Sequence, residues 1–241
     1  MLFASPVSSV LAVLAATATV IAQWDASRYA WYNTNADTNF AATLPIGNGR
    51  VAGAIYGTPA EKITLNENSV WSGPFTDRVN RNSGKNLASI RQQLQNGQIT
   101  AAGQATLNNM AGNPTSPRAY NPTVDLALDF GHQQNAISAY TRVLDTQTGS
   151  AWLTYTTGGV NYTREYVSSY PHGVLTFRMK SGTANKLSVK VSLQRSQWVL
   201  ANTASVANGV GTVSLRGNSG QSSDAISFTS AVRVVQSGGK L

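Results

Sequence analysis

The densest group of hydrogen-bonding side chains lies in residues 44–74, LPIGNGRVAGAIYGTPAEKITLNENSVWSGP. Near its end, the run NENS brings amide, carboxylate and hydroxyl groups close to one large flat indole ring. Sugars are bound by this combination, because hydroxyls need hydrogen-bond partners and the C–H face of the ring packs on an aromatic. The candidates for carbohydrate contacts are therefore Asn48, Arg50, Asn66, Glu67 and Trp71.

Two strands and a tight turn must position these side chains. Gly47 and Gly49 flank Asn48 and predict a turn that needs positive φ angles. The small and aliphatic run 51–56 predicts a buried strand, and 62–66 predicts a second strand that ends at the polar cluster. An alternative stays open, in which the same polar groups only tie down a loop or form an interface between domains.

These motifs resemble the opening of the amino-terminal domain of glycoside hydrolase family 95, the α-L-fucosidase family. There the corresponding segments look like PIGNGRLGAMVYG and LNEDTLWSGGP, against PIGNGRVAGAIYG and LNENSVWSGP in this chain. Later segments extend the resemblance over about residues 31–193, namely IRQQL, MAGNP, AYNPTVDLALDF, YTRVLD and GGVNYTREYVSSYP.

The resemblance implies a β-sandwich of the super-sandwich type. In the family, the catalytic acid and the groups that activate water lie on an (α/α)6 barrel that follows this domain, and no such barrel is found in the sequence. We therefore expect no catalytic residue and no cofactor in this chain. Two hypotheses remain: the amino-terminal domain of an inverting fucosidase-like hydrolase, or a free-standing sandwich that binds glycan without hydrolysing it.

Periodicity predicts the same mainly β, antiparallel fold. Short strands separated by polar turns are expected at 124–130, 140–145, 151–156, 160–168, 174–179, 187–193, 211–216 and 225–235. Between the predicted strands 62–66 and 124–130, residues 82–97 and 99–110 have helical spacing and predict an inserted helical hairpin. Its expected role is to cover one end or face of the sheet.

Other residues that could do chemistry have weaker patterns. Asp125 and Asp129 share one face of a strand, but four residues of strand separate them by about 13 Å, which is too far for a pair of glycosidase carboxyls. We interpret them as solvated edge charges. The two histidines, His132 and His172, have no acidic or cysteine partner at ligand spacing, so no metal site is expected.

The segment that precedes the cluster is rich in aromatic residues. Trp24, Tyr29, Trp31 and Tyr32 lie within nine residues. They form either a sugar-binding platform or an edge strand whose rings cover the core, and the second interpretation is favoured.

The amino terminus predicts secretion. Residues 1–22 carry no charged side chain and resemble a signal peptide cleaved before Gln23, which leaves residues 23–241 as one domain. Its sandwich is either complete or incomplete at the carboxyl end. Asn161 lies in the glycosylation sequon Asn161-Tyr162-Thr163. The net charge of +8 comes from scattered residues, so nucleic acid is not expected as a partner. The expected partner is a fucosylated oligosaccharide, a plant cell-wall polysaccharide or a catalytic barrel. Contact with a membrane is not expected after the signal peptide is removed.

Overall fold

The computed structural model describes residues 25–73, 76–116, 118–220 and 225–241. The predicted signal peptide, residues 1–22, lies outside these ranges, as does Trp24. None of the described helices is long and apolar enough to cross a membrane.

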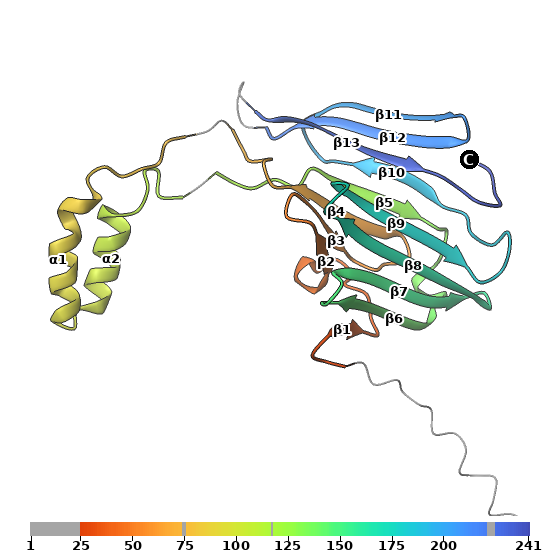
Figure 1. Cartoon of the computed structure of the whole chain (residues 1–241), viewed down its shortest axis with the longest axis horizontal. Helices are drawn as coiled ribbons and strands as arrows, with labels where there is room; N and C mark the ends of the chain where they lie inside the picture. The colour runs from red at the N-terminus through yellow and green to blue at the C-terminus, as the bar shows by residue number, and fades with distance from the viewer. Residues whose placement is uncertain (1–24, 74–75, 117, 221–224) are drawn as a thin grey trace, which may run out of the picture.

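The described residues form thirteen strands, two α-helices and two short 3-10 helices (Figure 1). The strands are β1 (Tyr29–Tyr32), β2 (Leu44–Gly47), β3 (Val51–Ile55), β4 (Glu61–Glu67), β5 (Val124–Asp129), β6 (Ser138–Asp145), β7 (Ser150–Thr157), β8 (Val160–Ser169), β9 (Val174–Ser181), β10 (Lys190–Gln194), β11 (Val199–Ala207), β12 (Val210–Asn218) and β13 (Ser227–Val234). The helices are η1 (Phe40–Ala42), α1 (Ser83–Gln95), α2 (Ile99–Asn109) and η2 (Gln134–Ala136).

Every strand pair is antiparallel, and the strands form three sheets. Two five-stranded sheets have the orders β1-β6-β7-β8-β9 and β10-β5-β4-β3-β2, and β11-β12-β13 form a third. The alternating strands place their apolar residues between the two large sheets, where the side chains of both form one core. The mainly β sandwich predicted from periodicity is therefore confirmed, with β2 and β11 as strands that the sequence pattern had not indicated.

One buried ion pair joins the two large sheets. Glu61 begins β4, Arg164 lies on β8, and both side chains are almost fully excluded from solvent, with 3.1 Å between Arg164 Nη1 and Glu61 Oε2. Glu61 also accepts hydrogen bonds from the Gly57 N–H and from the Tyr166 hydroxyl. Burial raises the pKa of Glu61, and the charge of Arg164 opposes that rise.

The guanidinium of Arg164 is fixed by further contacts. It donates to the carbonyls of Thr58 and Pro59 and to the Tyr155 hydroxyl, at 2.7, 2.9 and 2.8 Å. It also lies over the ring of Phe130, with 4.0 Å to the ring centre. The neighbouring Glu165 points to the opposite face, as strand geometry requires, and pairs with Lys180 on β9.

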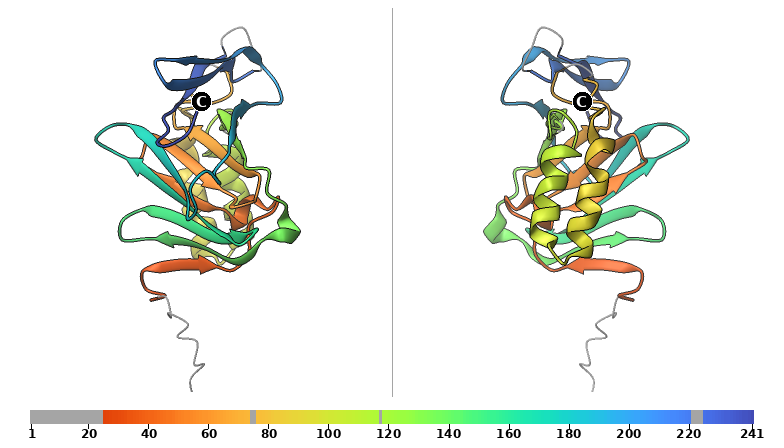
Figure 2. Two further views of the ribbon diagram at one scale, coloured as in Figure 1. Left: turned by 90° about the vertical axis from the view of Figure 1, so that its right-hand side faces the viewer. Right: turned by 90° about the vertical axis from the view of Figure 1, so that its left-hand side faces the viewer.

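The helical hairpin is present, but its expected position over the sheet is wrong. It projects away from the sandwich in Figure 1, and the two views of Figure 2 look along this direction, so that the helices overlap the sheets there. Its own buried side chains, Ile90 of α1 and Ala102 of α2, pack where the helices meet, whereas Leu94, Ile99 and Leu107 are at least half exposed. The reason is that the two helices bury their small apolar face against each other.

Three local expectations also need correction. Asp125 lies on β5 between β10 and β4, not on an edge, and accepts a hydrogen bond from Thr64. Gly47 is an ordinary strand residue of β2, and the positive φ of the turn, 88°, is found at Gly49. β1 is an edge strand as expected, but Trp31 and Tyr32 are each 45% exposed and do not cover the core.

The pairing of Glu61 with Arg164 generates a stability prediction. Replacing Arg164 by Met removes the cation and leaves the carboxyl buried without its counter-charge, so we expect the free energy of unfolding to fall by about 3–5 kcal/mol. The matched control is Arg178→Met, because Arg178 is exposed and its contact with Glu165 is long, 3.8 Å. This control should change stability by less than about 0.5 kcal/mol. Urea unfolding of both variants measures the difference, and equal losses would contradict the assigned role.

Candidate functional site

The pairing of β3 with β4 brings most of the predicted site residues to one end of the sandwich. Val51 lies opposite Glu67, so Arg50, directly before β3, lies next to that carboxylate. Arg50 Nε donates to Glu67 Oε1 at 3.1 Å. Two of the predicted site residues, Arg50 and Glu67, are therefore in direct contact at the end of β4.

The Glu67 carboxylate is already occupied by local donors. Its Oε2 accepts from the Ser69 backbone N–H at 2.9 Å and from the Ser69 hydroxyl at 2.5 Å, and its Oε1 accepts from Arg50. Burial alone would raise the pKa of Glu67, but the Ser69 and Arg50 contacts outweigh it and the pKa is lowered. An ionised carboxylate with filled acceptor sites is not suited to act as a general acid.

Asn48 has a structural task that the sequence did not reveal. Its Oδ1 accepts from the N–H groups of Arg50 and Val51, which holds the β2–β3 turn. Its Nδ2 donates a hydrogen bond to the carbonyl of Ser169, at the end of β8, over a distance of 3.0 Å. Because β8 belongs to the other large sheet, this one side chain links the two sheets at this end.

Trp71 meets a partner that sequence analysis did not select. Trp71 and Tyr120 form an isolated antiparallel bridge, and their ring centres lie 5.1 Å apart at an angle of 55°. Trp71 Nε1 donates to the Asn68 carbonyl at 2.8 Å. Each residue is 41% exposed, so the pair presents one aromatic surface to solvent. Tyr120 was detectable in principle, since it opens the AYNP segment that carried part of the resemblance.

The two chain segments that lead to and from the helical hairpin meet at this aromatic pair. We call this region, residues 70–73 and 118–121, the neck. Ser72 donates its backbone N–H to the Ala119 carbonyl at 2.8 Å, and Asn121 donates its backbone N–H to the Val70 carbonyl at 3.0 Å. The Asn121 amide also reaches Ser72 Oγ and the Ser219 carbonyl beyond β12. The neck therefore joins the hairpin, β4 and the third sheet.

Asn66 is separated from the other candidates. It lies opposite Ala52 and next to Glu67, so its side chain points to the other face of the sheet. Within the described residues its amide has no side-chain hydrogen bond. The groups that remain available for a ligand or a partner at this end are the Arg50 guanidinium, 78% exposed, and the Trp71 and Tyr120 rings.

Most of the described carboxyls are held by cationic side chains. Six of them are in ion pairs. The pKa of Asp145, for example, is held well below its usual range, chiefly by the two hydrogen bonds from Arg28. Burial raises the pKa of Glu61, but solvent does not reach this carboxyl, so a substrate could not reach it either.

Metal binding is not indicated in the described part of the chain, where no group of three or more His, Asp or Glu side chains converges. His132 instead lies 2.9 Å from the Tyr155 hydroxyl through Nδ1. Burial, together with the nearby Arg164, lowers its pKa.

Comparisons with known proteins show the family of this chain. Residues 30–241 match the family described as glycosyl hydrolase family 65, N-terminal domain. The chain belongs to this family. It is 28% identical over 155 residues to "Alpha-L-fucosidase 2" of Arabidopsis thaliana, which covers 64% of this chain and 18% of that protein. It is also 28% identical over 187 residues to "Probable alpha-fucosidase A" of Aspergillus oryzae, which covers 76% of this chain and 25% of that protein.

The relatives confirm the resemblance to fucosidases that the motifs indicated. The matched region spans about a fifth to a quarter of the length of these relatives. The match begins at residue 30, so it includes β2, β3, β4, the hairpin and the neck. These elements therefore lie within the region that matches the family.

The different tasks of two asparagines give a prediction at this site. Asn48→Ala removes three hydrogen bonds, including the link between the sheets, and should lower the free energy of unfolding by about 1–2 kcal/mol. Asn68→Ala is the matched control, because its amide makes one exposed contact, to the Gly49 carbonyl. We expect it to cost less than about 0.5 kcal/mol. Thermal unfolding of both variants decides, and a larger loss in Asn68→Ala would contradict this assignment.

Proposed function

We propose that this chain is the amino-terminal domain of a secreted α-L-fucosidase-like glycoside hydrolase, and that it has no hydrolytic activity by itself. The observation that carries the proposal is the match of residues 30–241 to a glycosidase amino-terminal domain, together with two relatives named as fucosidases, of which the matched regions cover only 18% and 25%. Two carboxyls support the second part, because Glu61, whose pKa is raised, is closed to solvent and the pKa of Glu67 is lowered by its contacts with Ser69 and Arg50.

The neck end of the sandwich is the surface that fits contact with a catalytic domain. Trp71 and Tyr120 supply a half-exposed aromatic pair, and Arg50 supplies an exposed cation beside it. Aromatic residues and arginine are enriched in the energetically important centres of interfaces. Because the polar groups around them are paired locally, the surface is rigid before any partner binds.

A second candidate function uses the same aromatic pair. A sugar ring stacked on Trp71 would make the chain a carbohydrate-binding sandwich, with a fucosylated oligosaccharide or a plant cell-wall polysaccharide as ligand. The exposure of both rings favours this alternative, whereas the filled acceptor sites of Glu67 weaken it. Calorimetry with fucosylated oligosaccharides distinguishes the two functions, since Trp71→Ala abolishes binding only in the second.

The main proposal is tested by the source of fucosidase activity. Antibodies raised against the recombinant 25.5 kDa chain should remove α-L-fucoside hydrolysis from the culture medium of the native organism, and they should detect a much larger polypeptide. The purified recombinant chain should hydrolyse an aryl α-L-fucoside no faster than its Glu67→Gln variant. A native band near 25 kDa with no loss of activity on depletion would overturn the proposal.

Secretion predicts glycosylation at Asn161. The residue is exposed in β8, after the turn at Gly158 and Gly159, and its Oδ1 accepts a hydrogen bond from the Thr156 hydroxyl. The side-chain nitrogen, which would carry the glycan, has no hydrogen bond within the described residues. Chain secreted from a eukaryotic host should therefore lose mass when treated with an N-glycosidase. Asn161→Gln should abolish the shift and Thr163→Ser should retain it, and an unshifted wild-type chain would contradict the prediction.

A further inference from the structure

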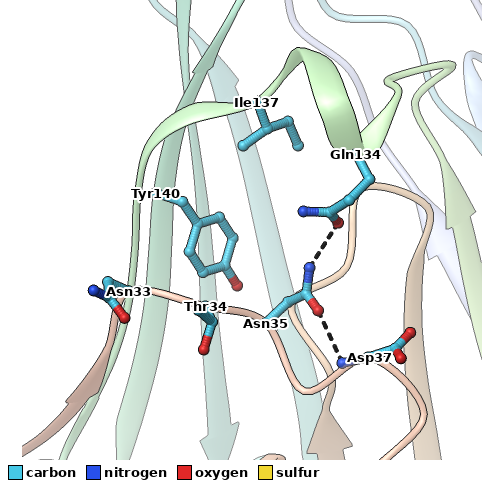
Figure 3. Close-up of a pocket in the computed structure, with 7 residues that line it drawn as sticks. All are labelled: Asn33, Thr34, Asn35, Asp37, Gln134, Ile137 and Tyr140. Carbon is cyan, nitrogen blue, oxygen red and sulfur yellow. Dashed lines mark hydrogen bonds between the residues drawn. The ribbon is translucent and has the colours of Figure 1, made fainter.

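An open pocket lies at the end of the sandwich opposite the neck. Its volume is about 530 Å³, and it is lined by residues 33–35 and Asp37 on one side and by Gln134, Ile137 and Tyr140 on the other (Figure 3). The volume is within the range of roughly 300–1,000 Å³ that small-molecule sites have. The five residues of β3 separate this pocket from the Arg50 end by about 17 Å.

The loop that forms one wall is fixed before any ligand enters. Asn35 donates to Gln134 Oε1 at 2.7 Å and accepts from the Asp37 N–H at 2.9 Å. The buried Ala36 donates its N–H to the carbonyl of Tyr56 at 2.9 Å, which anchors the loop at the end of β3. A preorganised wall lowers the entropy cost of binding.

Arg142 and Tyr140 hold the floor of the pocket. Arg142 of β6 donates to the Thr34 carbonyl at 2.7 Å, beneath the loop. The Tyr140 hydroxyl donates to the Gly57 carbonyl at 2.8 Å, and burial raises the pKa of this phenol, which therefore stays neutral. Its ring remains available as an apolar wall, together with the side chain of Ile137, and both point toward the same space in Figure 3.

Polar groups suited to hydroxyls remain unused around this apolar wall. The Gln134 Nε2 points toward the Tyr140 ring in Figure 3, because its Oε1 is held by Asn35. The Asn33 amide and the Asp37 carboxylate have no side-chain hydrogen bond within the described residues, and the carboxylate points away from the Tyr140 ring in Figure 3. The pocket thus offers amide donors and acceptors and an apolar surface, with one carboxylate at its rim, and one sugar ring uses this combination.

The charge of the pocket selects among sugars. Asp37 is the one ionisable carboxyl in its lining, and the Arg142 guanidinium beneath the loop is already directed to the carbonyls of Thr34 and Ala42. An acidic sugar would be repelled, although the chain as a whole has a net charge of +8. We propose that this pocket binds one neutral sugar residue of a glycan, as a non-catalytic site distinct from the neck. This goes beyond the proposed glycosidase role and does not depend on it.

The test compares two neutral sugars with one acidic sugar. The full chain, labelled with ¹⁵N, is titrated with D-galactose, with L-fucose and with D-galacturonate while its NMR spectrum is followed. Galactose or fucose should shift the amide signals of residues 33–37 and the side-chain amide of Gln134. Galacturonate, which differs from galactose in charge at one carbon, should bind about tenfold more weakly, because Asp37 places a negative charge at the rim of the pocket.

Two variants assign binding to the pocket. Gln134→Ala should weaken galactose binding by about tenfold, since it removes a donor and releases Asn35. Asp37→Asn should leave galactose binding within about twofold and bring galacturonate to a similar affinity, because the shape is kept and the charge is lost. Asn tolerates the φ of 49° found at this position, so the loop should keep its fold. The matched control is Asp77→Asn, an exposed aspartate before the helical hairpin, which should change neither affinity.

Three results would overturn the proposal. They are the absence of shifts at residues 33–37 with both neutral sugars, unchanged discrimination in Asp37→Asn, and loss of binding in Trp71→Ala, which would place the sugar at the neck. Hydrolysis is not measured in any of these experiments. Failure of the glycosidase proposal therefore leaves this test unaffected, and the reverse is also true.

Discussion

The pairing of Glu61 with Arg164 is the interaction on which the sandwich depends. It connects β4 of one large sheet to β8 of the other in a region that solvent does not reach. A buried carboxylate is costly unless its oxygens are paired, and here the Gly57 N–H, the Tyr166 hydroxyl and the guanidinium all serve it. The same arginine holds the carbonyls of the β3–β4 connection, so the position of β4 relative to the opposite sheet is fixed.

The two ends of β3 and β4 have different properties. One end carries the neck, with half-exposed aromatic rings and an exposed cation, and the helical hairpin extends from it. The other end carries the pocket, with amides, a carboxylate and one tyrosine ring. Contact with a catalytic domain at the neck would leave the pocket free. The chain can therefore be both a domain of a glycosidase and a carrier of its own sugar site without conflict between the two surfaces.

The polar cluster at the end of β4 illustrates how one set of residues divides between structure and function. Glu67 and Asn48 direct their side chains to backbone N–H groups and to Ser69, and thereby satisfy a turn and a loop. Trp71 donates its indole N–H to the backbone, yet leaves its ring half exposed. Hence the hydrogen-bonding residues of the motif account mainly for the local fold, while the aromatic pair and Arg50 remain for a partner.

The sequence by itself determined the fold class, the helical hairpin and the clustering of residues 48–71, because these follow from periodicity, turn glycines and the pairing of adjacent strands. It also determined the relationship to fucosidases, since local motifs carried that resemblance. Tertiary structure alone decided that Arg164 meets Glu61, that Trp71 meets Tyr120 and that Asn35 meets Gln134. The partners in each of these pairs lie far apart in the chain. Such contacts depend on how the sheets stack, and the pattern within one strand does not encode that arrangement. The direction of the hairpin was undetermined for the same reason: helical spacing shows that a helix has an apolar face, and only the assembled fold shows which surface covers it.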